Sequence, residues 1–574
     1  FIESGIDCYQ SLQTTAGMEV GRLKALFGDH LAFWGGVPVE DLITGTPEDV
    51  FEWLARYVEI GYRHLGGGYR EGRLQQLYAM SLLTGRTTRL VAAPLDVRSF
   101  DWSPDSRMLV FAAKAEADLG LNLNEDLWVT GRDGEDRFRI TTNPGPDRDP
   151  RWISDDRIAF LRSENPLWES APMTIAVMKT GEWEAGGLEL HSGGLDDLFR
   201  QYDATGGVFH VLKAERGCLD LVRVEGDVHV RLTDGGHDFW SFKVGGDRAV
   251  LQGSGQTLPG AIFTVELGGK GPASPEVVID PNEEWRRRVE LVEPERFEIE
   301  VEGRPIEGWF FKPVGLHEGE RVPVVLSIHG GPQWMYGGYF LPEFHILPRY
   351  GFGVVIANPT GSMGYGAQFM LDVRGDWTGR PARELMACLD HAVELGWADP
   401  DRMAVMGGSY GGHLGAALTT QGDRFRAAAL DRMFPELVAF WGTTDEKWFP
   451  EWAFMGRPWE PDAGEVYRRN SPWEQVDRVN TPTLVSHGMR DYRCLIAGAE
   501  MWFSALRSRG VPARLIRFET EGHGIRDPRN IVFYNADHFK TRVKAAVAAQ
   551  RTPVEWVVID ASPINVVDVT GLRK

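Results

Sequence analysis

Strand-like and helix-like segments alternate through residues 295–550, and this alternation limits the possible fold more than any other feature of the sequence. Short aliphatic runs typical of buried strands occur at Val324–Ile328, Gly353–Ala357, Arg402–Met406, Thr483–Ser486 and Arg514–Phe518. Amphipathic segments of helical period, residues 381–395 and 495–507, lie between some of these runs. Strands and helices that alternate in this way form a mostly parallel sheet with helices on both faces. The region therefore predicts an α/β domain, in which ligands bind at the carboxyl ends of the strands.

A G-x-S-x-G pattern lies between two of these segments. Gly407–Gly411 follows the strand-like run that ends at Met406, and residues 413–418 are compatible with a helix. In a strand-to-helix turn of this kind the serine lies in strained backbone, and small neighbours prevent steric clashes. A glycine-rich turn without chemistry is the alternative interpretation, but the flanking segments favour a nucleophile. We therefore predict that Ser409 is a catalytic nucleophile.

A reactive serine needs a general base and a carboxylate that orients the base. Asp491 and His523 each follow one of the last two predicted strands, just past its carboxyl end. The chain order Ser, Asp, His is that of α/β-hydrolases. Asp445 is a rival carboxylate without a clear preceding strand, and His487 is better suited to support its loop than to catalyse. We therefore predict a triad of Ser409, Asp491 and His523.

The oxyanion of an acyl-transfer reaction needs two hydrogen-bond donors. The backbone N–H of Tyr410, directly after the predicted nucleophile, is one candidate. The N–H of Gly331 is the other, because the glycines of His329–Pro332 follow a predicted strand and let the backbone approach the substrate. A tight turn without this role is the alternative for the second segment.

Residues 75–290 have a different pattern, with short strands separated by turn signals. Asp101–Asp105 precedes the strand-like run 108–112, and Asp149–Ser154 precedes the similar run 158–161 about fifty residues later. A recurrence at about 40 to 50 residues is typical of propeller blades with four strands each. We predict a β-propeller-like domain of about four to five blades, with an irregular β-sandwich as the alternative.

Charge and cysteine spacing exclude several classes of function. The 574 residues include 61 Lys and Arg against 82 Asp and Glu, a formal net charge of -21. Because such a surface repels phosphates and anionic lipids, we expect no nucleic-acid partner and no membrane association. The four cysteines lie far apart and form no zinc motif, and no P-loop or dinucleotide motif occurs, so we expect no metal and no cofactor. We expect a cytoplasmic location, although a chain that starts at Phe1 gives no basis for judging a signal peptide.

Several motifs in residues 295–550 occur together in one order. They are Gly308–Trp309, His329–Pro332, Asn358–Gly366, Gly407–Gly412, Pro458–Glu460, Ser471–Trp473, His487–Asp491 and Glu521–Gly524. The region resembles the catalytic domain of the prolyl oligopeptidase family of serine peptidases, and is most similar to its acylaminoacyl-peptidase and dipeptidyl-peptidase-like bacterial members. The resemblance implies an α/β-hydrolase fold, the triad and oxyanion donors named above, and an N-terminal propeller that admits only short peptides. The predicted propeller is shorter than the seven or more blades common in the family.

The sequence also departs from the family pattern. Thr360 replaces a frequent Arg, Pro381 and Arg383 occur in a helix start that is often acidic, and Cys494–Leu495 replaces the usual Val-Pro. None of these differences removes a predicted triad residue.

The two ends of the chain resemble other families. Residues 1–70 are similar to the C-terminal part of a uroporphyrinogen decarboxylase-type barrel, and residues 552–574 to the early part of a STAS domain. Most of each domain is absent, so the resemblance implies no activity for either fragment, and we interpret the chain as a chimera or a misjoined gene.

The sequence predicts a serine peptidase that hydrolyses short peptides through an acyl-enzyme, without a cofactor. An esterase of the same fold and a catalytically impaired chimeric scaffold are the alternatives. Aromatic residues at Trp441, Trp448, Phe449 and Trp452 predict an apolar substrate pocket, with core packing as the other interpretation. The sequence leaves the oligomeric state, the cleaved bond and the terminal specificity open.

Overall fold

The computed structural model describes strands 8–12 and 32–35 and residues 74–525, except 81–86, 92–93, 116–121, 182, 184–186, 192–198, 205–207, 227, 270 and 318. The chain separates into two units, one of residues 1–62 and 69–73, the other of residues 63–68 and 74–574. In the first unit β1 (Cys8–Leu12) and β2 (Ala32–Gly35) form a parallel pair. Residues 552–574, for which the sequence predicts a resemblance to a STAS domain, and all of 1–70 apart from these strands lie outside the described residues.

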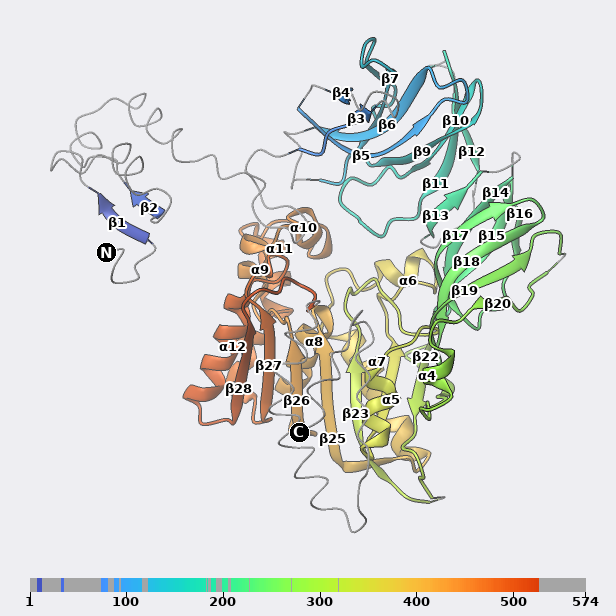
Figure 1. The fold of residues 1–574 in the computed structure, drawn as a ribbon. Coiled ribbons are helices and arrows are strands. Elements are labelled where there is room, and N and C mark those ends of the chain that lie inside the picture. The colour runs from blue at the N-terminus through green and yellow to red at the C-terminus, as the bar shows by residue number, and fades with distance from the viewer. Residues whose placement is uncertain are drawn as a thin grey trace, which may run out of the picture. The chain divides into compact units, whose positions relative to one another are not determined.

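Four antiparallel sheets of four strands each follow in the second unit, preceded by the strand pair β3–β4 (Figure 1). Their strand orders are β5-β6-β7-β8, β12-β11-β10-β9, β13-β14-β15-β16 and β17-β18-β19-β20. The strands are β3 (Tyr78–Met80), β4 (Thr87–Arg89), β5 (Leu95–Trp102), β6 (Met108–Ala115), β7 (Asp126–Gly131), β8 (Phe138–Arg139), β9 (Asp147–Ser154), β10 (Arg157–Arg162), β11 (Thr174–Lys179), β12 (Glu189–His191), β13 (Phe199–Asp203), β14 (Phe209–Glu215), β15 (Cys218–Glu225), β16 (Val228–Arg231), β17 (Asp238–Gly245), β18 (Arg248–Gly255), β19 (Leu258–Glu266) and β20 (Glu276–Ile279). Sheets of consecutive antiparallel strands make this region β-propeller-like.

Apolar side chains hold successive sheets together. Val110 and Val129 of the first sheet share a buried cluster with Ile158 and Phe160 of the second. The two repeated sequence units also meet, because the Oδ2 atom of Asp101 accepts a hydrogen bond from the N–H of Trp152 at 2.9 Å. The recurrence found in the sequence therefore corresponds to a contact between neighbouring sheets.

The C-terminal domain contains an eight-stranded sheet of order β21-β22-β24-β23-β25-β26-β27-β28. Its strands are β21 (Glu295–Val301), β22 (Arg304–Phe311), β23 (Val322–Ile328), β24 (Gly353–Asn358), β25 (Ala398–Gly408), β26 (Phe425–Asp431), β27 (Thr483–Gly488) and β28 (Ala513–Phe518). β22 pairs antiparallel with both β21 and β24, and β23 through β28 run parallel to one another. The five predicted strands are present, whereas β21, β22 and β26 were not predicted from the sequence. The architecture is that of an α/β-hydrolase.

Helices lie on both faces of this sheet. The helices of this part of the chain are α4 (Glu283–Arg286), α5 (Glu343–Arg349), α6 (Ala367–Leu371), α7 (Arg380–Glu394), α8 (Tyr410–Thr420), α9 (Leu437–Thr443), α10 (Trp448–Ala453), α11 (Pro461–Arg469), the 3-10 helix η5 (Pro472–Arg478) and α12 (Ile496–Ser508). Successive strand residues point to opposite faces. Val354 and Ile356 of β24 belong to a cluster with Phe344 of α5, whereas Val355 and Ala357 belong to the cluster that contains α7. Helices α5 and α7 therefore lie on opposite faces.

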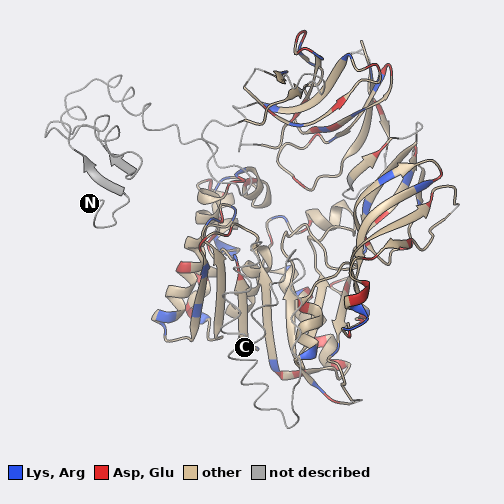
Figure 2. Ribbon diagram, viewed as in Figure 1, with Lys and Arg blue, Asp and Glu red and all other residues tan. Residues whose placement is uncertain are grey.

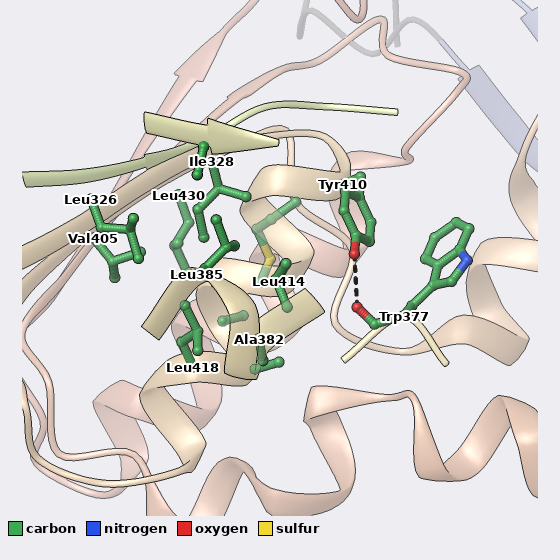
Figure 3. Close-up of a cluster of buried hydrophobic side chains, with 14 of the residues drawn as sticks. Leu326, Ile328, Trp377, Ala382, Leu385, Val405, Tyr410, Leu414, Leu418 and Leu430 are labelled. Carbon is green, nitrogen blue, oxygen red and sulfur yellow. Dashed lines mark hydrogen bonds between the residues drawn. The ribbon is translucent and has the colours of Figure 1, made fainter. Parts of the chain in front are cut away.

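The core around the central strands fixes the position of β25. Leu326 and Val405 lie in one fully buried cluster with Leu385 of α7 and Leu414 of α8 (Figure 3). Complete burial of such a side chain contributes about 1.5 to 3 kcal/mol. Strand β23, the neighbour of β25, contains no charged residue (Figure 2). A strand packed in this way holds its carboxyl end, at Gly408, in a defined place.

A hairpin of the third blade-like sheet contacts loops of the C-terminal domain. The N–H of Arg216 donates to the carbonyl of Gly364 at 2.9 Å, and the N–H of Gly338 donates to the carbonyl of Gly217 at 2.7 Å. Trp168 stacks on Trp452 of α10 with 5.4 Å between ring centroids. These contacts place blade-like sheets beside loops that follow strands of the C-terminal sheet. No helix among the described residues has the length and apolarity that a membrane crossing requires.

Candidate active site

Ser409 lies in the turn between β25 and α8, with backbone angles φ +59° and ψ −124°. A residue other than glycine in this conformation costs about 1 to 3 kcal/mol, and the surrounding structure must impose it. A Cβ at Gly411 would overlap the carbonyl oxygen of Ile328, and a Cβ at Gly407 would lie 2.5 Å from the carbonyl oxygen of Gly411. The N–H of Ser409 donates to the carbonyl of Asp431 at 3.0 Å. Glycine is therefore required on both sides of a tightly packed serine.

The structure brings the three predicted triad side chains together. His523 lies on the loop after β28, with its Nε2 atom 3.1 Å from the Oγ atom of Ser409. Its Nδ1 atom is 2.8 Å from the Oδ2 atom of Asp491, which follows β27. A histidine between a hydroxyl and a carboxylate at these distances can accept the proton of the hydroxyl while the carboxylate orients the ring.

Asp491 is fully buried, and its carboxylate is extensively hydrogen-bonded. Its Oδ1 atom accepts hydrogen bonds from the N–H groups of Arg493 at 3.0 Å and Cys494 at 2.9 Å. Burial alone would raise the pKa of Asp491, but hydrogen bonds from His487 and His523 outweigh this effect and hold the pKa well below its ordinary value. The carboxylate therefore stays ionised, as a group that orients an imidazole must.

The rival residues have other partners. The Oδ1 atom of Asp445 accepts a hydrogen bond from the Nε atom of Arg493 at 2.8 Å. The Nε2 atom of His487 donates to the carbonyl of Cys494 at 2.6 Å and lies 3.2 Å from the Oδ2 atom of Asp491. As expected from the sequence, His487 supports the loop that contains Asp491.

Both predicted oxyanion donors border the nucleophile. Gly331 lines the same cavity as Ser409 and has a φ of +115°, which only glycine adopts readily. Tyr410 is the first residue of α8, and its buried hydroxyl donates to the carbonyl of Trp377 at 2.8 Å (Figure 3). Within the described part of the chain, neither backbone N–H donates to a protein acceptor. Both donors are therefore available to a ligand.

A cavity of about 1180 Å³ contains Ser409 and His523. Blade-like sheets and their connections contribute one part of its wall, including Leu161, Glu169 and Met173. The catalytic domain contributes an aromatic part formed by Phe434, Phe440 and Phe449, and the charged residues Arg432, Glu446 and Arg493. The reactive side chains therefore face a chamber that residues far apart in the sequence enclose.

Of the four aromatic residues predicted to form a substrate pocket, Phe449 lines this cavity. Trp448 and Trp452 are buried, and Trp441 contacts the ring of Trp459 edge-on at 4.9 Å. These three do not line the cavity, so core packing describes them better. Phe440, which belongs to the same aromatic segment as Trp441 and was considered for the pocket with it, also lines the cavity.

A buried charged cluster adjoins the chamber. Arg493 pairs with both Asp445 and Glu446, whose side chains are 0% and 2% exposed. Burial raises the pKa of Glu446 to about 8, against the opposing effect of Arg493. No group of three His, Cys, Asp or Glu residues in the described structure has the arrangement of a metal site.

Known proteins resemble this chain in sequence and in fold. Residues 339–542 match the model of the prolyl oligopeptidase family. An uncharacterized peptidase of Bacillus subtilis is 28% identical over 81% of this chain and 73% of its own length. Dipeptidyl-peptidase 5 of Porphyromonas gingivalis is 25% identical over 77% of this chain and 66% of its own length.

Solved structures show the same architecture. The acylaminoacyl peptidase of Pyrococcus horikoshii has a TM-score of 0.63 at 22% identity, covering 84% of this chain and 86% of its own. A puromycin-hydrolyzing peptidase of Mycobacterium tuberculosis has a TM-score of 0.61 at 23% identity, covering 79% of this chain and 70% of its own. The match of residues 339–542 to the prolyl oligopeptidase family and the curated peptidase relatives indicate a serine-type peptidase, and the solved structures share its fold.

Proposed function

We propose that Ser409, His523 and Asp491 form the catalytic triad of a peptidase that hydrolyses short peptides. The observation that carries this proposal is the position of His523, 3.1 Å from the Ser409 hydroxyl and 2.8 Å from the Asp491 carboxylate. The strained turn at Ser409 and the ionised state of Asp491 support the same assignment.

The reaction uses two steps of acyl transfer. The Oγ atom of Ser409 attacks the peptide carbonyl while Nε2 of His523 takes the hydroxyl proton, and Asp491 stabilises the imidazolium. The N–H groups of Gly331 and Tyr410 donate to the oxyanion. The intermediate then collapses, and His523 gives its proton to the leaving amine. Water attacks the acyl-enzyme with His523 as base, which releases the carboxylic acid and restores Ser409.

The cavity supports a substrate of a few residues. Its volume of about 1180 Å³ slightly exceeds the roughly 300 to 1,000 Å³ of pockets for drug-sized molecules. The names of the relatives, among them dipeptidyl-peptidase and acylaminoacyl peptidase, are consistent with short peptides. Because Phe434, Phe440 and Phe449 line one side, we propose that the residue next to the cleaved bond is apolar.

Peptide p-nitroanilides and p-nitrophenyl esters test this proposal. We expect the wild-type protein to cleave both substrates, and Ser409→Ala to cleave neither. An enzyme that cleaves esters but leaves all anilides intact would be an esterase. A folded protein that fails to react with a fluorophosphonate at Ser409 would be an inactive scaffold.

The resemblances of residues 1–70 and 552–574 to other families stay predictions, as does the division of the chain into domains. We propose no activity for the end fragments.

A further inference from the structure

Arg432 directly follows β26 and lines the chamber beside the proposed triad. Its φ of +41° is unusual for a residue with a side chain. Its backbone N–H donates to the carbonyl of Ser486 in β27 at 2.7 Å. The guanidinium lies 3.4 Å from the Oδ2 atom of Asp431, whose own carbonyl accepts the N–H of Ser409. Arg432 is therefore fixed at the carboxyl end of β26, next to the residue whose carbonyl bonds the N–H of Ser409.

The guanidinium also contacts both sides of the triad. It packs against Gly408, where a Cβ would lie 2.7 Å from the Nη2 atom and 3.0 Å from the Nε atom of Arg432. Its Nη1 atom donates to the backbone carbonyl of His523 at 3.0 Å. One rigid, planar group thus touches the residue before the nucleophile and the main chain of the base.

The main chain around His523 has few other attachments. Among the described residues, no further hydrogen bond is made by the backbone of residues 522–525. The preceding part of the loop is better held, because the carbonyl of Glu521 accepts the N–H of Arg490 at 2.8 Å. Asp491 orients the imidazole of His523, and the hydrogen bond from Arg432 holds the main chain to which that imidazole is attached.

We propose that Arg432 is a positioning residue that holds His523 within proton-transfer distance of Ser409. This inference rests on the proposed function. General-base catalysis needs a distance of about 2.6 to 3.2 Å between the two heavy atoms, and a displacement of about 1 Å can cost on the order of 10²-fold in rate. The contacts of Arg432 are with the backbone of His523, with Asp431 and with Gly408 rather than with the Ser409 hydroxyl or the imidazole, so we expect its removal to lower kcat more than it raises KM.

The test uses Arg432→Gly, because glycine accepts the positive φ and removes the whole side chain. With a peptide p-nitroanilide, we expect kcat to fall about 30- to 100-fold and KM to change less than about threefold. Millimolar guanidinium ion, well below denaturing concentration, should restore at least tenfold of the lost kcat by occupying the vacated site. Arg432→Lys should retain part of the activity, because its ammonium can donate to the His523 carbonyl.

Arg426→Met is the matched control, since Arg426 lies on the same strand and bonds the backbone of Asp401 outside the chamber. We expect its kcat to equal that of the wild type. A kcat of Arg432→Gly within threefold of the wild type, or a loss without guanidinium rescue, would overturn the inference. If the wild type reacts with a fluorophosphonate but cleaves no anilide, the peptidase proposal fails. The inference about Arg432 is then tested by the labelling rate of Ser409, which should fall by the same factor in Arg432→Gly and recover with guanidinium.

Discussion

The two sides of the active site are held in place by different means. The side of Ser409 is fixed by backbone packing, because α8 approaches β25 and β23 so closely that a Cβ at Gly407 or Gly411 would collide with main-chain atoms. The side of Asp491 and His523 is fixed by hydrogen bonds between loops. The packed side tolerates no added atom, but its stability does not depend on pH. The stability of the hydrogen-bonded side depends on the ionisation of the Asp491 carboxylate. The comparison predicts different responses to substitution on the two sides.

The largest effect on activity should come from Ser409→Ala, which removes the proposed nucleophile. We expect kcat for a peptide p-nitroanilide to fall by about 10⁴-fold or more. Alanine keeps the strained turn, so the urea unfolding midpoint should stay within error of the wild type. The control is Ser508→Ala near the end of α12, where the hydroxyl is exposed and activity should not change. A Ser409→Ala protein that retains a tenth of the activity would contradict the assignment of the nucleophile.

On the hydrogen-bonded side, Asp491→Asn should lower kcat by about 10³- to 10⁴-fold, because an amide can donate to His523 and favour the wrong tautomer. Its effect on stability should depend on pH. The pKa of Asp491 is lowered in the folded protein, so its ionised form stabilises the fold above the ordinary Asp pKa of about 4, and this contribution is lost as the pH falls below that value.

Urea unfolding of the wild type and Asp491→Asn at pH 7, 5, 4 and 3 measures this effect. We expect the difference in unfolding free energy between the two proteins to shrink steadily below pH 5. A difference that is constant over this range would show that the carboxylate gains no stability from ionisation. The two sides of the site would then not differ in the pH dependence of their stability.

On the packed side, Gly411→Ala should destabilise the protein by about 3 kcal/mol, because the new Cβ overlaps the carbonyl oxygen of Ile328. Activity should fall with it, since the turn at Ser409 must shift. Gly442→Ala in helix α9 is the matched control, as no atom lies within 4 Å of a Cβ there. Alanine should stabilise that helix by about 0.5 kcal/mol. Equal stability of the two variants would contradict the role given to close packing.

The same difference explains what could be predicted from the sequence. Ser409, Asp491 and His523 could be proposed as a triad from the sequence because each follows a strand with a clear aliphatic pattern. Arg432 was missed because its strand β26, with the sequence Phe-Arg-Ala-Ala-Ala-Leu-Asp, lacks β-branched residues and was not predicted. Local patterns predict the parallel sheet and its carboxyl edge, but they do not show which side chains the loops bring together there.

The aromatic residues illustrate the same limit. Trp452 was expected to contact substrate, but it stacks on Trp168, which lies almost three hundred residues earlier in the chain. Nothing in the spacing of residues 441–452 indicates that partner. Burial of a side chain between two domains depends on their contact, and the sequence of either segment alone does not contain that information.

The smallest predicted effect isolates the strain stored at Ser409. Ser409→Ala and Ser409→Gly both lack the hydroxyl, so their difference in stability reports the backbone alone. Relief of the strained conformation should gain about 1 to 3 kcal/mol, and the greater freedom of glycine in the unfolded chain should offset about 0.4 to 1 kcal/mol of it. We therefore expect Ser409→Gly to be about 1 kcal/mol more stable than Ser409→Ala in urea unfolding. If Ser409→Gly proved less stable than Ser409→Ala, the backbone at residue 409 would be relaxed rather than strained. Packing around the turn would then hold Ser409 in a conformation that a residue with a side chain adopts without cost.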